Sequence, residues 1–486
     1  MLSEVVNDSQ EAGRLQEQMK NSNAAGGPWE YGTLRTDGRY LRNGETAFFW
    51  LGDTAWLLFQ RLTEEEAEVY FRNRAEKGYS VIQATLFHAV PDVNAYNEHA
   101  FEDLDIAKPL AAYWDRADRI VGIAEKYGLY MGLLPHWGSY SKKYSAEQGR
   151  VYARFLAERF RNRPNVIWIL GGDTRGNEAA EYWNAMGTVF REKDPERLIC
   201  FHPFGRTTSI DFFPDPDWLD VHMFQSGHRR YDQTQLKAWD DNDGDSYSFG
   251  EDNWKYVDRV YKMTADAPKP VLDAEPSYEN IPQGLHSGAE PYWRDHDVRR
   301  YAWWSVLEGA CGFTYGHNAI MQFWNTRDKA GGYNCWETWQ EALHHPGSDS
   351  VSHMARLLRS LDYTKGKAAR GLLVDNGDRY NRIACFAGED YVLAYSYTGR
   401  NITLRENALT GRWAAYWMNP LTGAMSYMET RDFGSATSAP TAISTASAAA
   451  AANAAAAGNP DLWTFRSPAK EYMPNPDWLL VLRRED

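Results

Sequence analysis

The sequence predicts an α/β fold: a (β/α)8 TIM barrel followed by a small antiparallel β-sandwich domain. Eight apolar, strand-like runs lie between residues 47 and 318, and amphipathic helical patterns follow most of them. Continuously apolar strands are typical of a parallel sheet buried on both faces, and eight such units match a TIM barrel. From about residue 366 the chain changes to short β-rich runs separated by Asn, Gly and Pro, which indicates the sandwich.

Capping signals mark the helix boundaries between these strands. Thr63 and Glu66, and again Ser145 and Gln148, stand at capping-box spacing, in which each side chain satisfies a backbone N–H of the other residue. Gly78 follows the first of these helices, where a glycine usually ends a helix. The strands are predicted at residues 47–54, 79–87, 129–137, 165–173, 197–205, 219–228, 269–279 and 309–318.

A doubly wound open sheet is the structural alternative. It would usually carry a Gly-rich nucleotide-binding loop after its first strand, whereas here that strand ends in LGDTAW. We therefore expect a flexible leader at 1–27, a catalytic barrel at 28–365 and a C-terminal β-sandwich at 366–486. A Ser/Ala/Thr-rich tract at 433–460 interrupts the sandwich, and we interpret it as a hairpin insertion or loop, with a helix as the alternative.

Composition and charge exclude several classes of partner. The net charge of -14 argues against nucleic acid, because phosphates require a basic surface. No run of about 18 apolar residues predicts a membrane span. The N-terminus lacks the apolar core of a signal peptide, so we expect a cytoplasmic protein, or a periplasmic or secreted one if a leader is missing. The four cysteines show no CxxC spacing, which predicts neither a disulfide framework nor a zinc site.

Aromatic residues make up 14% of the chain, including 20 Trp and 29 Tyr. They suit either a large core or a sugar-binding cleft, in which the apolar faces of sugar rings pack on aromatic rings. A carbohydrate substrate is therefore the partner that we expect, and the sequence leaves the oligomeric state open.

Two carboxylates stand at strand ends on opposite sides of the predicted barrel mouth, where active sites of such barrels lie. Asp173 follows the fourth strand and Glu275 follows the seventh. Glycoside hydrolysis needs such a pair, one as proton donor and the other as an ionised nucleophile or base. Taken alone, Asp173 could cap the next helix, with Glu178 as a rival acid. Glu275 could form a structural ion pair, with Asp273 as its rival.

Other polar and aromatic residues at strand ends complete the predicted sugar site. We expect their side chains to orient sugar hydroxyls or to form aromatic walls. No HxH or HExxH spacing supports a metal site, and the predicted chemistry requires neither a metal nor an organic cofactor. The predicted substrate-binding residues are Asp53, Trp56, Gln83, His136, Trp137, Gln225, His228, Tyr315 and His317.

Several segments resemble a known enzyme family. The stretch FFWLGDTAWLLFQRLTEEEAEVYFRNRAEKGYSVIQATLF, with the later segments GGDTRGN, FQSGH and DAEPSYE, is similar to the apiosidase-like catalytic domain of glycoside hydrolase family 140. The resemblance runs from about residue 30 to about residue 360. The C-terminal region looks like the small β-domain that often follows this domain, a domain of collagen-binding type, although the Ala-rich insertion departs from it.

The resemblance implies a clan A retaining glycosidase with Asp173 as acid/base and Glu275 as nucleophile. Most clan A enzymes end strand four with Asn-Glu, whereas this chain has Gly172-Asp173, so backbone or substrate must sit closer. The family activity is the release of apiose from the pectic polysaccharide rhamnogalacturonan II. The alternatives are another clan A β-glycosidase (a galactosidase, glucosidase or arabinofuranosidase) and a non-catalytic carbohydrate-binding protein.

Overall fold

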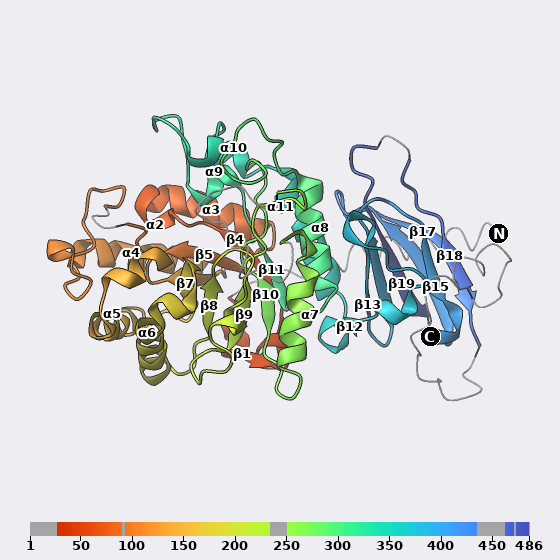
Figure 1. The fold of residues 1–486 in the computed structure, drawn as a ribbon, viewed down its shortest axis with the longest axis horizontal. Helices are drawn as coiled ribbons and strands as arrows, with labels where there is room; N and C mark the ends of the chain where they lie inside the picture. The colour runs from red at the N-terminus through yellow and green to blue at the C-terminus, as the bar shows by residue number, and fades with distance from the viewer. Residues whose placement is uncertain (1–26, 90–92, 234–249, 435–461, 471–472, 486) are drawn as a thin grey trace. The chain divides into compact units, whose positions relative to one another are not determined.

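The structure is a computed structural model that describes residues 27–89, 93–233, 250–434, 462–470 and 473–485. The predicted leader (1–27) and the predicted insertion (433–460) lie almost entirely outside these residues. The chain divides into two compact units (Figure 1). One comprises Ala24–Tyr301 and Ala310–Ser352, and the other includes Ala302–Gly309 and His353–Asp486.

The first unit contains a closed barrel of eight parallel strands, which confirms the predicted fold class. Consecutive strands are neighbours, and β11 pairs with β4 to close the barrel. Each strand falls within one of the eight apolar runs, except that β7 extends one residue further, to Thr174, and every strand residue except Asp173 is buried. The strands are β4 (Trp50–Thr54), β5 (Val81–Thr85), β6 (Tyr130–Leu134), β7 (Val166–Thr174), β8 (Ile199–Pro203), β9 (Val221–Phe224), β10 (Val271–Asp273) and β11 (Gly312–Tyr315).

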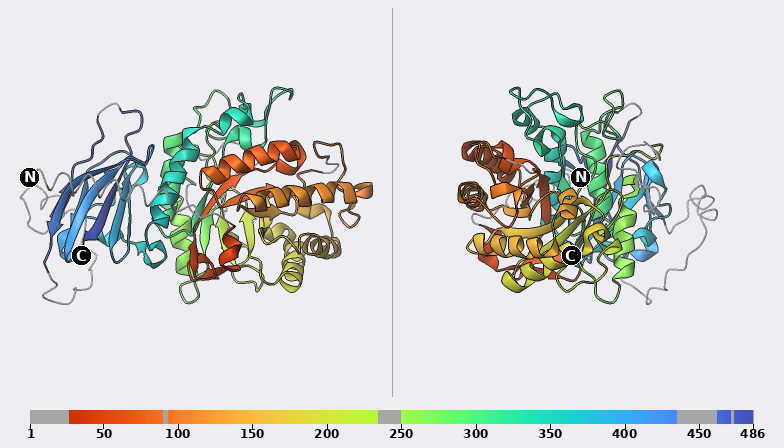
Figure 2. Two further views of the ribbon diagram at one scale, coloured as in Figure 1. Left: turned by 180° about the vertical axis from the view of Figure 1, so that it is seen from behind. Right: turned by 60° about the vertical axis from the view of Figure 1, so that its left-hand side comes forward.

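Helices cover the outside of the barrel (Figures 1 and 2). Both predicted capping boxes are present, at the first residues of α3 and of α5. The helices α5 and α6 pack side by side, and α6 contacts β7 and β8. The helices are α2 (Leu58–Arg61), α3 (Glu64–Glu76), α4 (Ala111–Lys126), α5 (Ala146–Arg159), α6 (Ala180–Lys193), α7 (Trp254–Met263), α8 (Asp295–Val306), α9 (Asn318–Met321), α10 (Trp339–Ala342) and α11 (Pro346–Arg359).

A three-stranded antiparallel sheet precedes the barrel and was not predicted. It consists of β1 (Leu34–Asp37), β2 (Tyr40–Asn43) and β3 (Thr46–Phe48). The single strand predicted at 47–54 is therefore two strands in two sheets, because β3 pairs with β2 while β4 pairs within the barrel. Tyr130, the first residue of β6, receives a hydrogen bond from Asn43 and packs edge-on against Phe48. The small sheet thus lies at the N-terminal end of the barrel.

The second unit is built from antiparallel strands, as the sequence predicts. Its buried core takes residues from both sheets, including Ile402 and Trp463 of the smaller sheet and Val392 and Leu480 of the larger one. One sheet has the order β12 (Lys367–Ala368), β13 (Ile383–Ala387), β14 (Tyr391–Ser396), β19 (Trp478–Glu485), β16 (Arg412–Met418) and β17 (Met425–Asp432), and the other pairs β15 (Ile402–Arg405) with β18 (Leu462–Phe465).

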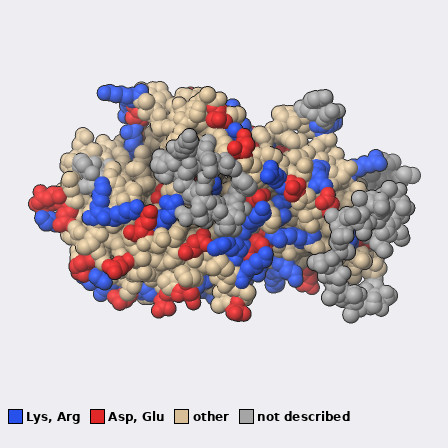
Figure 3. Space-filling model, in the orientation of Figure 1, with Lys and Arg blue, Asp and Glu red and all other residues tan. Residues whose placement is uncertain are grey.

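The visible surface mixes charges of both signs. Figure 3 shows Lys and Arg side chains interspersed with Asp and Glu over the face that it presents. Among the described residues, no helix is both long enough and apolar enough to cross a membrane.

Candidate active site

The strand β7 ends in an irregular turn that places Asp173. Its register with β8 is regular up to Gly171 and resumes at Thr174, so Gly172 and Asp173 form a bulge. The φ angles of Gly171, Gly172 and Asp173 are 90°, 102° and 46°. Glycine adopts such angles without steric cost, whereas an L-residue such as Asp173 is strained there. Strain of this kind persists where the surrounding structure enforces it, and it is concentrated at functional sites.

The surrounding backbone leaves no space for side chains at this bulge. A Cβ atom at Gly171 would overlap the carbonyl oxygen of His202 on β8. On the other side, a Cβ atom at Gly138, in the loop after β6, would overlap the carbonyl oxygen of Gly172. The glycines therefore let the backbone of β7 approach both neighbours, and this packing sets the direction of the Asp173 side chain.

Glu275 follows β10 and is held as an anion by two histidines. Its Oε1 lies 3.1 Å from Nε2 of His228, and its Oε2 lies 3.4 Å from Nε2 of His202. Burial raises the pKa of Glu275, but hydrogen bonds and charge from His202 and His228 outweigh burial and lower the pKa to about 2. A carboxylate that is ionised at neutral pH is the form that a nucleophile requires.

The hydrogen-bond network fixes the protons of these histidines. The backbone N–H of Tyr278 donates to Nδ1 of His228 over 3.4 Å, so Nε2 of His228 carries the proton that faces Glu275. His202 Nδ1 donates to the carbonyl oxygen of Pro203 over 3.2 Å, so its Nε2 faces Glu275 with a proton only when the ring carries both protons. The Tyr278 hydroxyl accepts a hydrogen bond from Nε1 of Trp56 over 2.9 Å, which ties the aromatic wall to the loop that carries Glu275.

Asp173 and Glu275 meet at the mouth of the barrel. One carboxylate oxygen from each, together with a ring nitrogen of His202, lie within 4.8 Å of one another. Strands four and seven therefore place their carboxylates in one site, as counting the strands suggested. The two carboxylates are therefore close neighbours at the barrel mouth.

Both carboxylates line a cavity of about 350 Å³. Trp56 and Trp137 pack edge-on in its wall, with ring centroids 5.2 Å apart. Phe204, Tyr278 and Tyr333 add further aromatic surface. The remaining polar lining comes mainly from Arg206, Gln225, His228, Arg229 and Gln322. Aromatic walls with a few polar side chains suit a small polar ligand such as a sugar.

Five of the predicted binding residues lie outside the lining of this cavity, whereas Trp56, Trp137, Gln225 and His228 line it. Asp53 is completely buried, and its Oδ2 accepts hydrogen bonds from Tyr70 and from Nε of Arg74, each over 2.6 Å. Gln83 donates hydrogen bonds to Thr54 and to the carbonyl oxygen of Ala274, and His136 is hydrogen-bonded to the hydroxyl of Tyr182. The Tyr315 hydroxyl donates to Glu279, and the His317 side chain caps the first turn of α9.

These side chains therefore stabilise the barrel wall and are not carried into the proposed sugar site. Their strand-end positions are the same as those of the lining residues. The difference is that each finds a buried protein partner, which a sequence does not reveal.

The rival carboxylates are also accounted for. Glu178 forms an ion pair with Lys142 over 2.8 Å. Asp273 is completely buried, and its Oδ2 accepts hydrogen bonds from Ser226 and Asn253. Burial raises the pKa of Asp273 to about 7 in spite of these bonds. Neither carboxylate lines the cavity, whereas Asp173 and Glu275 both do.

Several lining residues were not in the predicted set. Tyr278 carries the same strand-end signal as the predicted residues, and so does His202, which lies behind the cavity wall against Glu275. Arg206, Arg229 and Tyr333 lie in loops beyond the strands, where no periodicity marks them.

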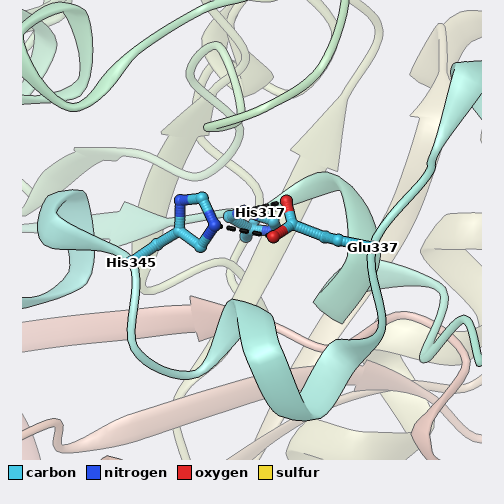
Figure 4. A group of neighbouring side chains, drawn as sticks. All are labelled: His317, Glu337 and His345. Atoms are coloured by element: carbon cyan, nitrogen blue, oxygen red, sulfur yellow. Dashed lines mark hydrogen bonds and ion pairs between the residues drawn. The ribbon is translucent and has the colours of Figure 1, made fainter.

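Two groups among the described residues bring three potential metal ligands within 4.8 Å: Asp173, His202 and Glu275, and a second group of His317, Glu337 and His345. The first group is the carboxylate pair, whose acid and nucleophile chemistry needs no metal. In the second, both histidines point at the Glu337 carboxylate (Figure 4). His345 Nε2 lies 2.7 Å from Oε2, and His317 Nε2 lies 3.4 Å from Oε1.

The hydrogen bonds of the second group join its side chains to one another and to Glu279. His317 Nδ1 accepts a hydrogen bond from the Ala319 backbone N–H, so the hydrogen of this neutral ring sits on Nε2 and faces Glu337. The pKa of His317 is well below its usual value because the ring is buried. Both nitrogens of His345 face carboxylates, Glu337 on one side and Glu279 on the other. Burial lowers the pKa of His345, but the bonds to Glu279 and Glu337 outweigh burial and raise it to about 9. These contacts make the group a buried ionic network, in which His345 lies between Glu337 and Glu279.

Comparisons with known proteins show the family of the chain. Residues 35–365, more than half of the chain, match the family model of the apiosidase-like catalytic domain. The chain belongs to the apiosidase-like family. It is similar to a solved structure titled "Glycoside hydrolase", with 35% identity, coverage of 95% of this chain and 100% of that one, and a TM-score of 0.84.

The apiosidase-like chain is also similar to a family 5 glycoside hydrolase from Bacteroides vulgatus ATCC 8482. The identity is 33%, the match covers 94% of this chain and 95% of that one, and the TM-score is 0.82. Residues 369–445 match a model named for the collagen-binding domain of a collagenase. None of the curated proteins matches the chain. The protein is therefore a glycoside hydrolase of the clan A TIM-barrel type.

Proposed function

We propose that this apiosidase-like enzyme is a retaining β-glycosidase that acts on pectic glycosides, most directly by releasing apiose. The observation that carries the proposal is the approach of the Asp173 and Glu275 carboxylates to within 4.8 Å at one cavity. A nucleophile must reach the anomeric carbon while the acid reaches the leaving oxygen, and a short separation supports direct attack.

The reaction then runs in two steps. Glu275 attacks the anomeric carbon while Asp173 gives its proton to the glycosidic oxygen, so the C–O bond breaks and the aglycone leaves as an alcohol. Asp173 next takes a proton from a water molecule, which attacks the anomeric carbon and breaks the ester to Glu275. Both carboxyl groups return to their starting states, and the sugar keeps its anomeric configuration.

The charges of the cavity support an acidic aglycone. Arg206 and Arg229 both line the cavity, although each is largely buried. Pectic polysaccharides carry uronate carboxylates, and guanidinium groups bind carboxylates through paired hydrogen bonds. On this proposal the scissile sugar lies against the carboxylate pair, and an acidic neighbour lies on the side of the cavity that Arg206 and Arg229 line.

Product analysis after incubation with rhamnogalacturonan II tests the function. Apiose should be released by the wild-type enzyme and not by Glu275→Ala. Glu178→Ala is the matched control, because Glu178 is the neighbouring carboxylate that the structure pairs with Lys142, and it should retain activity. Release of galactose, glucose or arabinose from other glycosides would identify a different clan A specificity, and no release from any substrate would indicate a binding protein.

A further inference from the structure

The loop at residues 331–337, which we call the aromatic loop, follows β11 and carries two exposed aromatic side chains. Tyr333 lines the cavity and is 37% exposed, and Trp336, three residues later, is 62% exposed. Loops that follow barrel strands lie on the active-site face. Consecutive Cα atoms are 3.8 Å apart, so the Cα atom of Trp336 lies within about 11 Å of that of Tyr333. Trp336 is thus within reach of a second sugar of a substrate bound at the cavity.

The backbone of the aromatic loop is strained and firmly held. Tyr333 and Asn334 have φ angles of 52° and 54°, in the left-handed region that non-glycine residues avoid. Gln322 bonds Gly332 through both its carbonyl oxygen and its amide, over 2.7 and 3.1 Å. Asn318 donates to the Tyr333 carbonyl oxygen over 3.0 Å. Strain of this kind is maintained when neighbouring groups enforce it.

The buried ionic network anchors the other end of the loop. Glu337, the residue after Trp336, is almost fully buried and is bound by His345 and His317 (Figure 4). The side-chain amide of Asn280 also donates to Glu337. His345 in turn contacts Glu279, which accepts a hydrogen bond from the Tyr315 hydroxyl on β11 over 2.6 Å. Trp336 is therefore exposed to solvent, while the next residue, Glu337, fixes its backbone to the barrel. A side chain on a fixed backbone loses less entropy when a ligand packs on it.

From these contacts we infer that the aromatic loop forms an additional sugar-binding subsite, with Trp336 as a platform for a sugar residue beyond the one held by Asp173 and Glu275. An indole face offers the apolar surface on which the CH face of a sugar ring packs, and its rigid side chain loses little entropy on binding. The inference rests on the proposed function for the identity of the polymer. It implies an enzyme that favours oligosaccharides and polysaccharides over simple glycosides.

The test compares substrates of two lengths. Trp336→Ala should lower kcat/KM on rhamnogalacturonan II about tenfold, mainly through KM, and should change kcat/KM on an aryl β-apiofuranoside less than about twofold. Trp336→Phe should restore much of the loss because it keeps an aromatic face. Tyr31→Ala is the control, since Tyr31 is an exposed aromatic residue, 51% accessible, next to the sheet at the opposite end of the barrel. Equal losses on both substrates, or no loss on either, would overturn the subsite.

A binding measurement separates this inference from the proposed function. Glu275→Gln protein, with and without Trp336→Ala, is run through native gels that contain soluble rhamnogalacturonan II, galactan or xyloglucan. If any one polysaccharide retards the protein with Trp336 and does not retard the Trp336→Ala variant, the subsite is supported, even if the wild-type enzyme releases no apiose. If no polysaccharide retards the protein, or if retardation is independent of Trp336, the subsite is refuted whatever the catalytic result.

Discussion

Asp173 occupies a backbone position that few aspartates adopt. It follows two glycines with positive φ, and its own φ is 46°. Related clan A barrels place a glutamate at the end of strand four, so this shorter side chain has to come closer to the substrate. The bulge in β7 adds residues on one strand and re-aims the side chain, and we expect it to bring Asp173 within reach of the substrate. The two glycines and Asp173 therefore form one backbone feature, in which the glycines permit the bulge and the bulge directs the Asp173 side chain.

A substitution at Gly171 tests whether the bulge depends on the missing side chain. We expect Gly171→Ala to lower the free energy of unfolding by about 2 kcal/mol or more, because left-handed strain adds to the overlap with the His202 carbonyl. Gly38→Ala is the matched control, since Gly38 also has positive φ, 56°, but has open space around it, and it should cost about 1 kcal/mol. Denaturant unfolding measures both. Equal losses of unfolding free energy in the two variants would show that the close approach of the Gly171 backbone to β8 does not contribute to stability.

His202 is expected to set the acid limit of activity. In the wild type the pKa of Glu275 is lowered to about 2, so the nucleophile stays ionised over the pH range in which most proteins stay folded. His202→Phe keeps a ring but removes the imidazole whose protonated form pairs with Oε2 of Glu275, so the pKa of Glu275 rises and the acid limb of kcat/KM moves to higher pH. His136→Phe is the control, because His136 bonds Tyr182 and does not line the cavity. An acid limb that stays in place in His202→Phe would contradict this assignment.

At the scale of elements, the barrel strands were the most predictable part of the structure. Each of the eight apolar runs contains one barrel strand, because strands of a parallel barrel are buried on both faces and leave a continuous apolar signal. The small sheet β1–β3 was missed because its strands are only three or four residues long and partly exposed.

The residues of the site were predictable only in part, because a strand-end position does not show which way a side chain faces. Asp173 and Glu275 stand out because counting strands places them opposite each other and glycoside hydrolysis needs that pair. Asp53 and His317 have the same kind of position, yet Arg74 and Glu337 bind them inside the protein. Which polar strand-end residue faces the cavity depends on its buried partners, and those come from distant parts of the chain.

The anchor of the aromatic loop should make stability depend on pH. The pKa of His345 is about 9 in the folded protein and about 6.5 in an unfolded chain, so its contribution is complete below about pH 6.5 and is lost as pH rises through 9. Its side chain is 24% exposed, so water screens part of the interaction and the loss should be roughly 2 kcal/mol. In His345→Gln this decline should be absent. Denaturant unfolding of both proteins between pH 6 and pH 9.5 measures it, and parallel pH profiles would refute the role of His345.

At the scale of the whole molecule, an acidic protein is proposed to bind an acidic polymer. The net charge of -14 repels a uronate-rich chain at long range, while the arginines of the cavity act at short range. Raising the salt concentration from roughly 10 to roughly 150 mM should therefore screen the repulsion and increase kcat/KM on rhamnogalacturonan II about twofold. The value of kcat/KM on a neutral aryl glycoside should not change. A steep fall of kcat/KM on the polymer as salt is raised would instead indicate that attraction by the arginines controls the association of enzyme and polymer.

The central claim is that Asp173 and Glu275 form a retaining pair. Methanol tests it directly, because a glycosyl ester on Glu275 is intercepted by methanol in competition with water. We expect NMR of a reaction with rhamnogalacturonan II in aqueous methanol to show a methyl β-glycoside of the released sugar, with the anomeric configuration of the substrate. Release of only the free sugar with inverted configuration, and no methyl glycoside, would contradict the account.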